Sequence, residues 1–334
     1  MSWFKQLTGI DEESPPQVRR DLSVDGDCIV CPDGRRIAWG SLHTPQLAEL
    51  RSDVADSKPT AGRSTLREIV GDARQLHRDP SNANAIFQVA SQFNLLEMTS
   101  PSVTPDQGVG IYENDPTQGP ACAIACGAGT IYRNYFAPVR GSDGLALVGQ
   151  TADHQIDCAA ELGKTLGQAG QAVWSMENGY LFPTDSGLDH INARLQSASA
   201  TQRDALRSEL RIGIQANASV TLPGAQHRVS QAYCSALPVA YGRQPADAWA
   251  DFAKLILEAA YEATFCASVL NADRTGSRKV YLTLLGGGVF GNRDEWITAA
   301  IARAFRKYRD WNLDVAIVSY RQSKPVVAEL VSML

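Results

Sequence analysis

The sequence lacks long apolar runs, a cleavable leader pattern and any cluster of basic residues. No segment reaches the roughly 20 consecutive apolar residues that a membrane-spanning helix needs. The first residues, Met1 to Asp11, are apolar only briefly and then become acidic, so no signal peptide is expected. The 31 Lys and Arg residues are scattered and are outnumbered by 36 Asp and Glu residues. Binding to nucleic acid or to an anionic membrane is therefore not expected, because phosphate backbones need clustered Lys and Arg.

Cysteine usage excludes a disulfide framework and a metal cluster. Seven cysteines are an odd number for disulfide pairing, and most lie in apolar runs. Reduced, buried thiols in a cytoplasmic protein are the expectation, although a leaderless secreted cargo would have the same features. Cys28 and Cys31 have metal-ligand spacing, but no second Cys or His pair follows closely, so no metal site is predicted.

What the chain does contain is an ordinary globular composition, with 44% apolar and 20% charged residues over 334 positions. Residues 1–60 differ from the rest and predict a small N-terminal appendage. Within them, an Asp-Gly turn joins strand-like segments at 28–31 and 36–39, which indicates a hairpin. The polar segment 52–63 is the candidate linker, and 64–334 is the predicted main domain.

From residue 64, strand and helix patterns alternate. The final unit is the clearest, with a strand over 279–285, a glycine-rich turn, a helix over 293–307 and a strand over 313–319. A strand–helix–strand unit of this length implies parallel neighbours in one sheet. Other expected elements are a strand at 86–90, a small-residue helix over 119–128, a strand over 132–138, a helix over 154–168, a strand pair over 173–183, helices near 187–197 and 202–211, and a long helix over 247–270.

The turn Gly286-Gly287-Gly288-Val289-Phe290-Gly291-Asn292 lies where a buried strand gives way to a helix. Open α/β sheets bind ligands at such positions, and glycines let a ligand approach backbone amides that favour an anion. No Gly-Lys-Ser/Thr follows, so this is not a Walker loop. A plain packing turn is the alternative, but three consecutive glycines and an aromatic exceed what a turn requires. The turn therefore predicts a phosphate-bearing ligand.

The turn resembles the second phosphate-binding loop of macrodomains, the ADP-ribose-binding α/β fold. The resemblance implies a three-layer α/β/α architecture with a mixed, largely parallel sheet. It also implies that the amides of Gly287 to Gly291 hold the pyrophosphate and that Phe290 packs on the distal ribose. The segment from Phe87 to Asn94 is similar to the macrodomain strand whose terminal Asn lies near that ribose.

The chain departs from the usual macrodomain pattern in two ways. It has no Gly-Gly-Gly-Val loop directly after Asn94, and it lacks the Glu-Glu signature of poly(ADP-ribose) glycohydrolases. The segments 115–126 and 132–135 resemble instead a divergent branch of macrodomain-like ADP-ribosyl hydrolases, which includes a Legionella effector acting on ADP-ribosylated ubiquitin. The implied ligand is ADP-ribose, without a cofactor, and the implied partner is an ADP-ribosylated protein, with ubiquitin as one candidate.

Cleavage of an ADP-ribosyl bond passes through an oxocarbenium-like state and needs a carboxylate. The loop between Asn94 and Gln118 supplies three, and we expect Asp106 and Asp115 to be the main catalytic residues, with Glu97 third. The alternative is that all three are solvated loop acids.

Further polar residues are candidates near this loop. Gln118 and Gly119, at a helix start, are expected to contact a phosphate, although Gly119 also suits a plain helix entry. Arg133 and Asn134 either face a ligand phosphate or satisfy the core.

Two rival functions stay open. One is a non-catalytic reader that binds ADP-ribose, for which the glycine turn alone would suffice. The other is a cysteine hydrolase with Cys122 near a helix start, although the surrounding Ala and Gly residues favour a packing role for that thiol.

Overall fold

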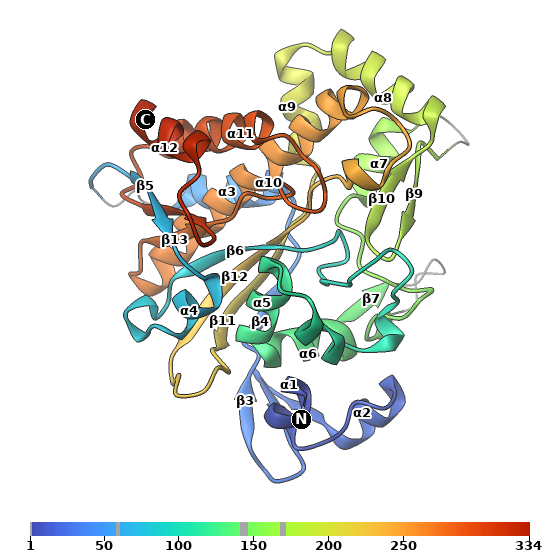
Figure 1. The fold of residues 1–334 in the computed structure, drawn as a ribbon, viewed down its shortest axis with the longest axis vertical. Coiled ribbons are helices and arrows are strands. Elements are labelled where there is room, and N and C mark those ends of the chain that lie inside the picture. The colour runs from blue at the N-terminus through green and yellow to red at the C-terminus, as the bar shows by residue number, and fades with distance from the viewer. Residues whose placement is uncertain (1, 58–60, 141–145, 168–171) are drawn as a thin grey trace.

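The computed structural model describes residues 2–57, 61–140, 146–167 and 172–334 (Figure 1). Its centre is a seven-stranded sheet. Four neighbouring pairs are parallel, and the two pairs at one edge are antiparallel. The mixed, largely parallel sheet predicted from sequence is confirmed. In spatial order its strands are β4 (Ser41–His43), β11 (Gly213–Ser219), β12 (Arg228–Cys234), β6 (Ile86–Ala90), β13 (Lys279–Leu282), β14 (Asp314–Ser319) and β5 (Thr65–Val70).

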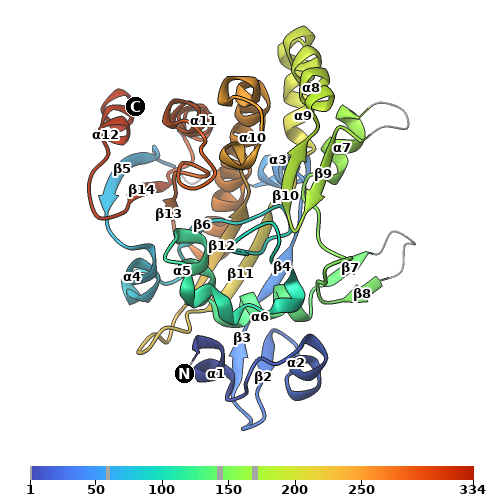
Figure 2. The same ribbon diagram turned by 45° about the vertical axis from the view of Figure 1, so that its right-hand side comes forward.

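Helices cover both faces of this sheet (Figure 2). Alternation along β6 shows the two faces: Gln88 donates to Thr264 on one side, while the Phe87 ring stacks on Tyr281 on the other, with centroids 4.6 Å apart. The three-layer α/β/α architecture is therefore confirmed. One face carries α3 (Leu47–Asp56), α8 (Asp185–Ser197), α9 (Ala200–Ser208), α10 (Ala246–Thr275), α11 (Asp294–Lys307) and α12 (Pro325–Met333), and the other carries α4 (Ala73–Arg78), α5 (Gln118–Ala125) and α6 (Gly127–Tyr135).

Several sequence predictions of single elements are confirmed. The final strand–helix–strand unit is β13, α11 and β14, with its two strands paired in parallel. The pair over 173–183 is the hairpin of β9 (Trp174–Glu177) and β10 (Tyr180–Pro183). Its turn residues Asn178 and Gly179 both have positive φ, as a tight hairpin turn requires.

Other predicted elements are wrong in extent or type. The expected helix over 119–128 breaks at Cys126 into α5 and α6, and α6 runs through Tyr135 where a strand was expected. Gly129 explains the close packing of α6, because a Cβ there would lie 3.0 Å from the Gln215 side chain on β11. The expected helix over 154–168 is shortened to α7 (Ala160–Leu166), and residue 168 lies outside the described residues.

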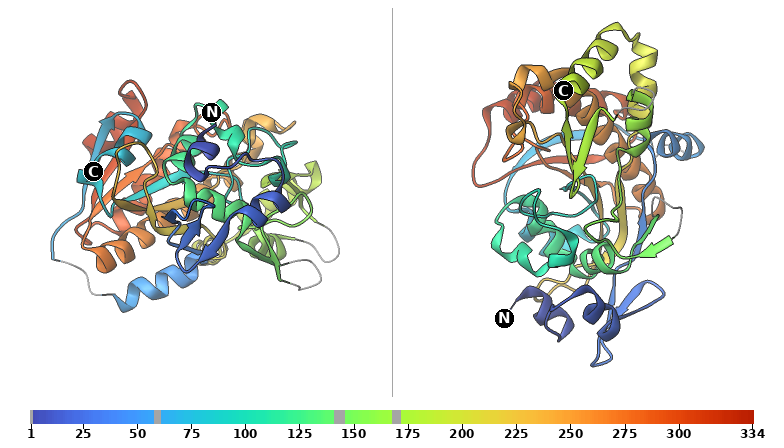
Figure 3. Two further views of the ribbon diagram at one scale, coloured as in Figure 1. Left: turned by 90° about the horizontal axis from the view of Figure 1, so that it is seen from below. Right: turned by 90° about the vertical axis from the view of Figure 1, so that its right-hand side faces the viewer.

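The N-terminal segment packs beneath α6 (Figure 3). Its strands β2 (Cys28–Val30) and β3 (Arg36–Ala38) form the predicted hairpin. Its apolar residues share one core with α6 and with the loop between β6 and α5. Residues 41–56 were not expected in the main body, but they form the edge strand β4 and helix α3, which packs on α10. The division at residues 60–64 stays a prediction, and positions 58–60 of the linker lie outside the described residues. The segment comprises α1 (Trp3–Thr8), α2 (Pro15–Asp21), β1 (Ser23–Asp25), β2 (Cys28–Val30) and β3 (Arg36–Ala38).

Candidate functional site

A cavity of about 270 Å³ lies over the carboxyl ends of β6, β12 and β13. Because these strands are parallel neighbours, their ends meet at one edge of the sheet, where open α/β sheets place their ligands. The glycine turn after β13, the end of β6, the start of α5 and β10 all contribute to its walls. We call this space the glycine-loop cavity and residues 286–292 the glycine loop. The structure thus brings together the two segments on which the macrodomain resemblance rests.

The glycines of the loop serve two different purposes. Gly286 and Gly291 have φ of +72°, which favours glycine, and a Cβ on Gly286 would lie 2.5 Å from the Ala236 side chain. Gly288 has neither constraint, since its φ is not positive and a Cβ there would meet no atom within 4 Å. Gly288 lines the cavity, so the open space beside it is available to a ligand.

Internal hydrogen bonds close the loop and leave four of its amides without an acceptor. Gly287 donates to the Leu284 carbonyl and Gly291 to the Gly288 carbonyl, both at 3.1 Å. Within the described chain, the N–H groups of Gly286, Gly288, Val289 and Phe290 have no hydrogen-bond partner. Of the run from Gly287 to Gly291, only Gly288, Val289 and Phe290 therefore have free donors for an anion.

Asn292 braces the loop and does not line the cavity. Its backbone N–H donates to the Gly286 carbonyl at 3.0 Å, and its side-chain Nδ2 donates to the Leu237 carbonyl at 2.8 Å. A role in direct ligand binding stays a prediction for this residue.

Three aromatic side chains form one wall of the cavity. The Phe290 ring lies 5.4 Å from Tyr180 and 5.8 Å from Tyr241, measured between centroids, and all three line the cavity. Tyr180 belongs to β10 and Tyr241 ends the short 3-10 helix η4 (Val239–Tyr241). Neither tyrosine belongs to a sequence motif, so only the fold brings them to the site.

Glu97 is the most unusual group in the cavity. It is 2% exposed, lines the cavity, and neither carboxylate oxygen has a hydrogen-bond partner in the described part of the chain. The nearest cation is buried Arg133, whose Nη2 lies 3.7 Å from Oε1. Burial raises the pKa of Glu97 to about 8, although Arg133 and the Tyr112 hydroxyl oppose the shift. Burial thus favours the protonated form of this carboxyl.

Arg133 belongs to the core and does not reach the ligand space. It is fully buried, donates to the Leu95 carbonyl at 2.9 Å, and lies 3.6 Å from the centroid of the Tyr233 ring. Of the two roles left open by the sequence, the structure favours the structural one. Asn134 likewise donates to the Pro105 carbonyl at 3.1 Å.

The two aspartates predicted as catalytic occupy different positions. Asp115 is half-buried, lines the cavity and accepts a hydrogen bond from the Thr117 amide at 2.8 Å. Asp106 is exposed, does not line the cavity, and accepts from the Ala152 amide at 2.7 Å.

The remaining predicted ligand-binding residues are engaged within the protein. Asn94 is fully buried, with its Nδ2 donating to Gln155 at 2.8 Å, and it does not line the cavity. Gln118 and Gly119 do line it, but the Gln118 side-chain amide is hydrogen-bonded to β6. It accepts from the Ala90 amide and donates to the Gln88 carbonyl. A Cβ on Gly119 would lie 2.1 Å from the Ala90 carbonyl, so glycine is required for α5 to approach β6.

Cys122 does not have the surroundings of a nucleophile. The thiol is fully buried and accepts a hydrogen bond from Gln118 Nε2 at 3.2 Å. Burial raises its pKa well above the ordinary value of 9.0, whereas a catalytic thiol needs a lowered pKa. The structure favours the packing role.

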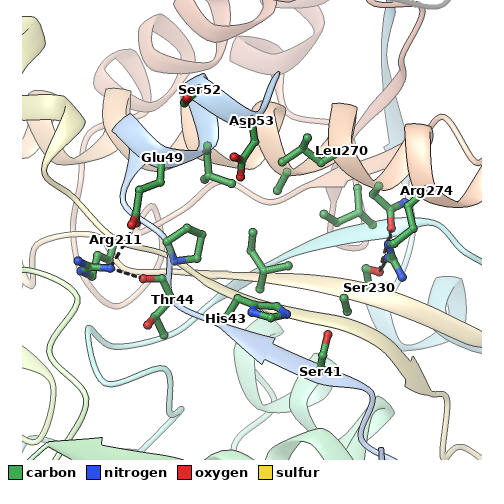
Figure 4. Close-up of a pocket in the computed structure, with 17 residues that line it drawn as sticks. Ser41, His43, Thr44, Glu49, Ser52, Asp53, Arg211, Ser230, Leu270 and Arg274 are labelled. Carbon is green, nitrogen blue, oxygen red and sulfur yellow. Dashed lines mark hydrogen bonds and ion pairs between the residues drawn. The ribbon is translucent and has the colours of Figure 1, made fainter. Parts of the chain in front are cut away.

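A second, larger cavity of about 790 Å³ lies between α3 and α10, beside strands β4 and β11 (Figure 4). Its arginines are already engaged: Arg211 with Glu49 and the Thr44 carbonyl, Arg274 with Ser230. Among its described lining residues, no buried side-chain polar atom lacks a partner. We call it the α3–α10 cavity.

The described ranges contain neither a candidate metal cluster nor a membrane-spanning helix. No group of three or more His, Cys, Asp or Glu residues there could hold a metal ion. No helix among the described residues is long and apolar enough to cross a membrane.

Comparison with known proteins gives structural matches only. No protein family model and no curated protein sequence matches this chain. Poly(ADP-ribose) glycohydrolase from Thermomonospora curvata is similar at a TM-score of 0.46 and 11% identity, over 95% of this chain and 95% of that chain. Poly(ADP-ribose) glycohydrolase from Deinococcus radiodurans, in complex with ADP-ribose, is similar at a TM-score of 0.43 and 12% identity, over 86% of this chain and 90% of that chain. Values this low do not show membership of that family.

Proposed function

We propose that this protein is an ADP-ribosyl hydrolase that cleaves the bond between the distal ribose and a modified protein side chain. The observation that carries the proposal is Glu97, a buried carboxyl without a hydrogen-bond partner among the described residues, in the cavity that holds the free amides of the glycine loop. Buried polar groups are normally hydrogen-bonded, and exceptions cluster at functional sites.

In this proposal the glycine loop binds the pyrophosphate. The amides of Gly288, Val289 and Phe290 donate to phosphate oxygens, and Phe290 packs against the ribose as the macrodomain resemblance implies. No Lys or Arg of the described ranges lines the cavity, so backbone dipoles supply the attraction for the anion.

The acidic residues then perform the chemistry. Protonated Glu97 donates its proton to the leaving group as the glycosidic bond breaks. Asp115, at the cavity wall and next to solvent, activates the water that attacks the ribose carbon. Asp106 stays a predicted catalytic residue, but its position outside the lining favours Asp115 between the two.

The finer features of the substrate rest on sequence resemblance. The likeness of segments 115–126 and 132–135 to the branch that includes the Legionella effector MavL supports ADP-ribosylated ubiquitin as a substrate. A cytoplasmic location, of a host or of the producing cell, belongs to the same proposal.

The test is incubation of the protein with ADP-ribosylated ubiquitin and with other ADP-ribosylated proteins, followed by chromatography of the released nucleotide. Release of intact ADP-ribose is the expected result. Release of AMP would mean that the pyrophosphate is cleaved, which contradicts the proposal. Binding of ADP-ribose without release from any modified protein would favour the non-catalytic reader.

A further inference from the structure

The carboxylate of Glu12, in the N-terminal segment, reaches the loop that carries the candidate catalytic acids. Its Oε1 accepts hydrogen bonds from the Val109 amide at 2.9 Å and the Tyr135 hydroxyl at 2.6 Å, and its Oε2 accepts from the Gly110 amide at 2.6 Å. Val109 and Gly110 lie in the segment 97–115, which we call the acidic loop because it contains Glu97, Asp106 and Asp115. Charge-assisted hydrogen bonds of this kind are the stronger ones in proteins.

The acidic loop is shaped to receive this carboxylate. A Cβ at Gly108 would lie 2.7 Å from the Glu12 side chain, and a Cβ at Gly110 would lie 2.6 Å from it. Gly108 also has φ of +84°, which favours glycine. The two glycines therefore allow the backbone of the loop to close around Glu12.

Trp3 holds the same part of the loop from a second direction. Its indole Nε1 donates to the Val109 carbonyl at 3.2 Å, and its backbone N–H donates to the Glu113 carboxylate at 3.0 Å. Both the N–H and the C=O of Val109 are thus bound by the N-terminal segment, which fixes the orientation of the two peptide units that flank Val109.

The held segment leads directly to the cavity. Gly110 begins the 3-10 helix η3 (Gly110–Asn114), and its fully buried Tyr112 accepts a hydrogen bond from the Glu97 amide at 3.0 Å. Asp115 follows, with its amide bonded to the Tyr112 carbonyl at 3.2 Å. One rigid turn therefore connects the Glu12 contact to both Glu97 and Asp115.

We propose that Glu12 is a positioning residue: through Val109, Gly110 and Tyr112 it holds Glu97 and Asp115 in the geometry that turnover needs. The proposal rests on the hydrolase function proposed above. The glycine loop follows β13 and has no contact with this turn in the described hydrogen bonds, so ligand binding and turnover should respond differently to a change at Glu12.

The experiment compares Glu12→Ala, Glu12→Gln and, as matched control, Glu13→Ala. Glu13 is adjacent in sequence and exposed, and its side chain has no hydrogen-bond partner in the described chain. We expect Glu12→Ala to lower kcat about 100-fold, the cost of a misplacement of about 1 Å, and to change the Kd of ADP-ribose less than about 3-fold. Glu12→Gln keeps one acceptor oxygen, so its kcat should lie between those of Glu12→Ala and the wild type. Glu13→Ala should have the kcat and Kd of the wild type.

The outcomes separate the two proposals. A wild-type protein that turns over no ADP-ribosylated substrate contradicts the hydrolase function itself. An active wild type with unchanged kcat in both Glu12 variants overturns the positioning role. Equal losses in kcat and in titration stoichiometry would reveal only a smaller folded fraction, and would also overturn it. Should Glu12→Ala fail to fold, the Glu12→Gln variant decides: lowered kcat with unchanged Kd supports the proposal, and wild-type kcat refutes it.

Discussion

Glu97 and Glu262 are both buried, but their surroundings give them opposite properties. Glu262, on α10, is fully buried and accepts from Arg51 and Arg303 at 2.6 Å each, and from Lys307. Hydrogen bonds to these cations outweigh its burial and lower its pKa to about 2. Glu97 has a single cation at 3.7 Å and no hydrogen bond to either oxygen in the described structure, and its pKa is raised to about 8.

Pairing with cations therefore distinguishes a buried carboxylate that holds elements of the fold together from a candidate site residue. Glu262 joins α3, α10 and α11 through its three cations. Its removal would leave Arg51 and Arg303 paired with Asp204 alone, and Lys307 without an anionic partner among the described residues. The Glu97 carboxyl makes no hydrogen bond within the described chain, yet it lines a cavity. The same contrast separates the two cavities. Among the described residues, the larger α3–α10 cavity has no buried side-chain polar atom without a partner, whereas the smaller one has both carboxylate oxygens of Glu97. Unsatisfied polar groups, and not volume, mark the candidate site.

The largest expected effect is on turnover in Glu97→Gln. The amide cannot donate a proton to a leaving group, so we expect kcat to fall about 10²- to 10⁴-fold while the Kd of ADP-ribose stays within about 3-fold. Steady-state kinetics and calorimetric titration measure the two quantities. Turnover at the wild-type rate would remove Glu97 from the mechanism.

The corresponding change at the other glutamate should affect stability instead. We expect Glu262→Ala to lower the free energy of unfolding by about 3–5 kcal/mol, since three cations lose their shared partner. Denaturant unfolding measures the loss. At a temperature where the variant stays folded, its kcat and Kd should match those of the wild type. A selective loss of turnover would contradict a purely structural role for Glu262.

The two aspartates of the acidic loop should differ in their effect on turnover. Asp115→Asn should lower kcat about 100-fold, because Asp115 lines the cavity as the candidate base. Asp106→Asn should lower it less than about 3-fold, because this exposed side chain only holds the Ala152 amide. The reverse order would exchange their assigned roles.

The pH dependence of stability should have opposite signs at the two glutamates. The raised pKa of Glu97 favours the folded state fully below its ordinary value of 4.5, and this contribution is lost as pH rises to about 8. The lowered pKa of Glu262 contributes stability above 4.5 that is lost as pH falls towards 2. Each slope is at most about 1.4 kcal/mol per pH unit.

Unfolding measured across pH 2–9 tests both slopes. The stability of Glu97→Gln relative to the wild type should increase as the pH rises from 5 to 8. Glu262→Gln should lack the loss of stability that the wild type shows as the pH falls from 4.5 to 2. Parallel profiles for Glu97→Gln and the wild type above pH 5 would contradict the raised pKa.

The sequence predicted those parts of the molecule that local patterns encode. Periodicity predicted α10 and the β13–α11–β14 unit, and the run of glycines predicted the glycine loop. Each of these patterns lies within one continuous segment of the sequence. Position in the fold was not predictable in the same way. Tyr180 and Tyr241 reach Phe290 from distant elements, and edge strand β4 is only three residues long.

Among the acids, the sequence could not rank the candidates. Glu97, placed third, is the one that the fold buries without hydrogen bonds among the described residues, whereas Asp106 is held at the surface. Burial and pairing depend on tertiary contacts such as those of Arg133 and Tyr112, which no spacing in the acidic loop reveals.

The most direct test of the account is calorimetric titration of ADP-ribose into the wild type, Gly288→Glu and Ser52→Glu. Gly288 faces open space in the glycine-loop cavity, and exposed Ser52 places the same charge at the α3–α10 cavity. The account predicts a wild-type Kd below about 100 μM, retained in Ser52→Glu and weakened at least about 100-fold in folded Gly288→Glu. No binding to the folded wild type, or equal binding by Gly288→Glu, would contradict it.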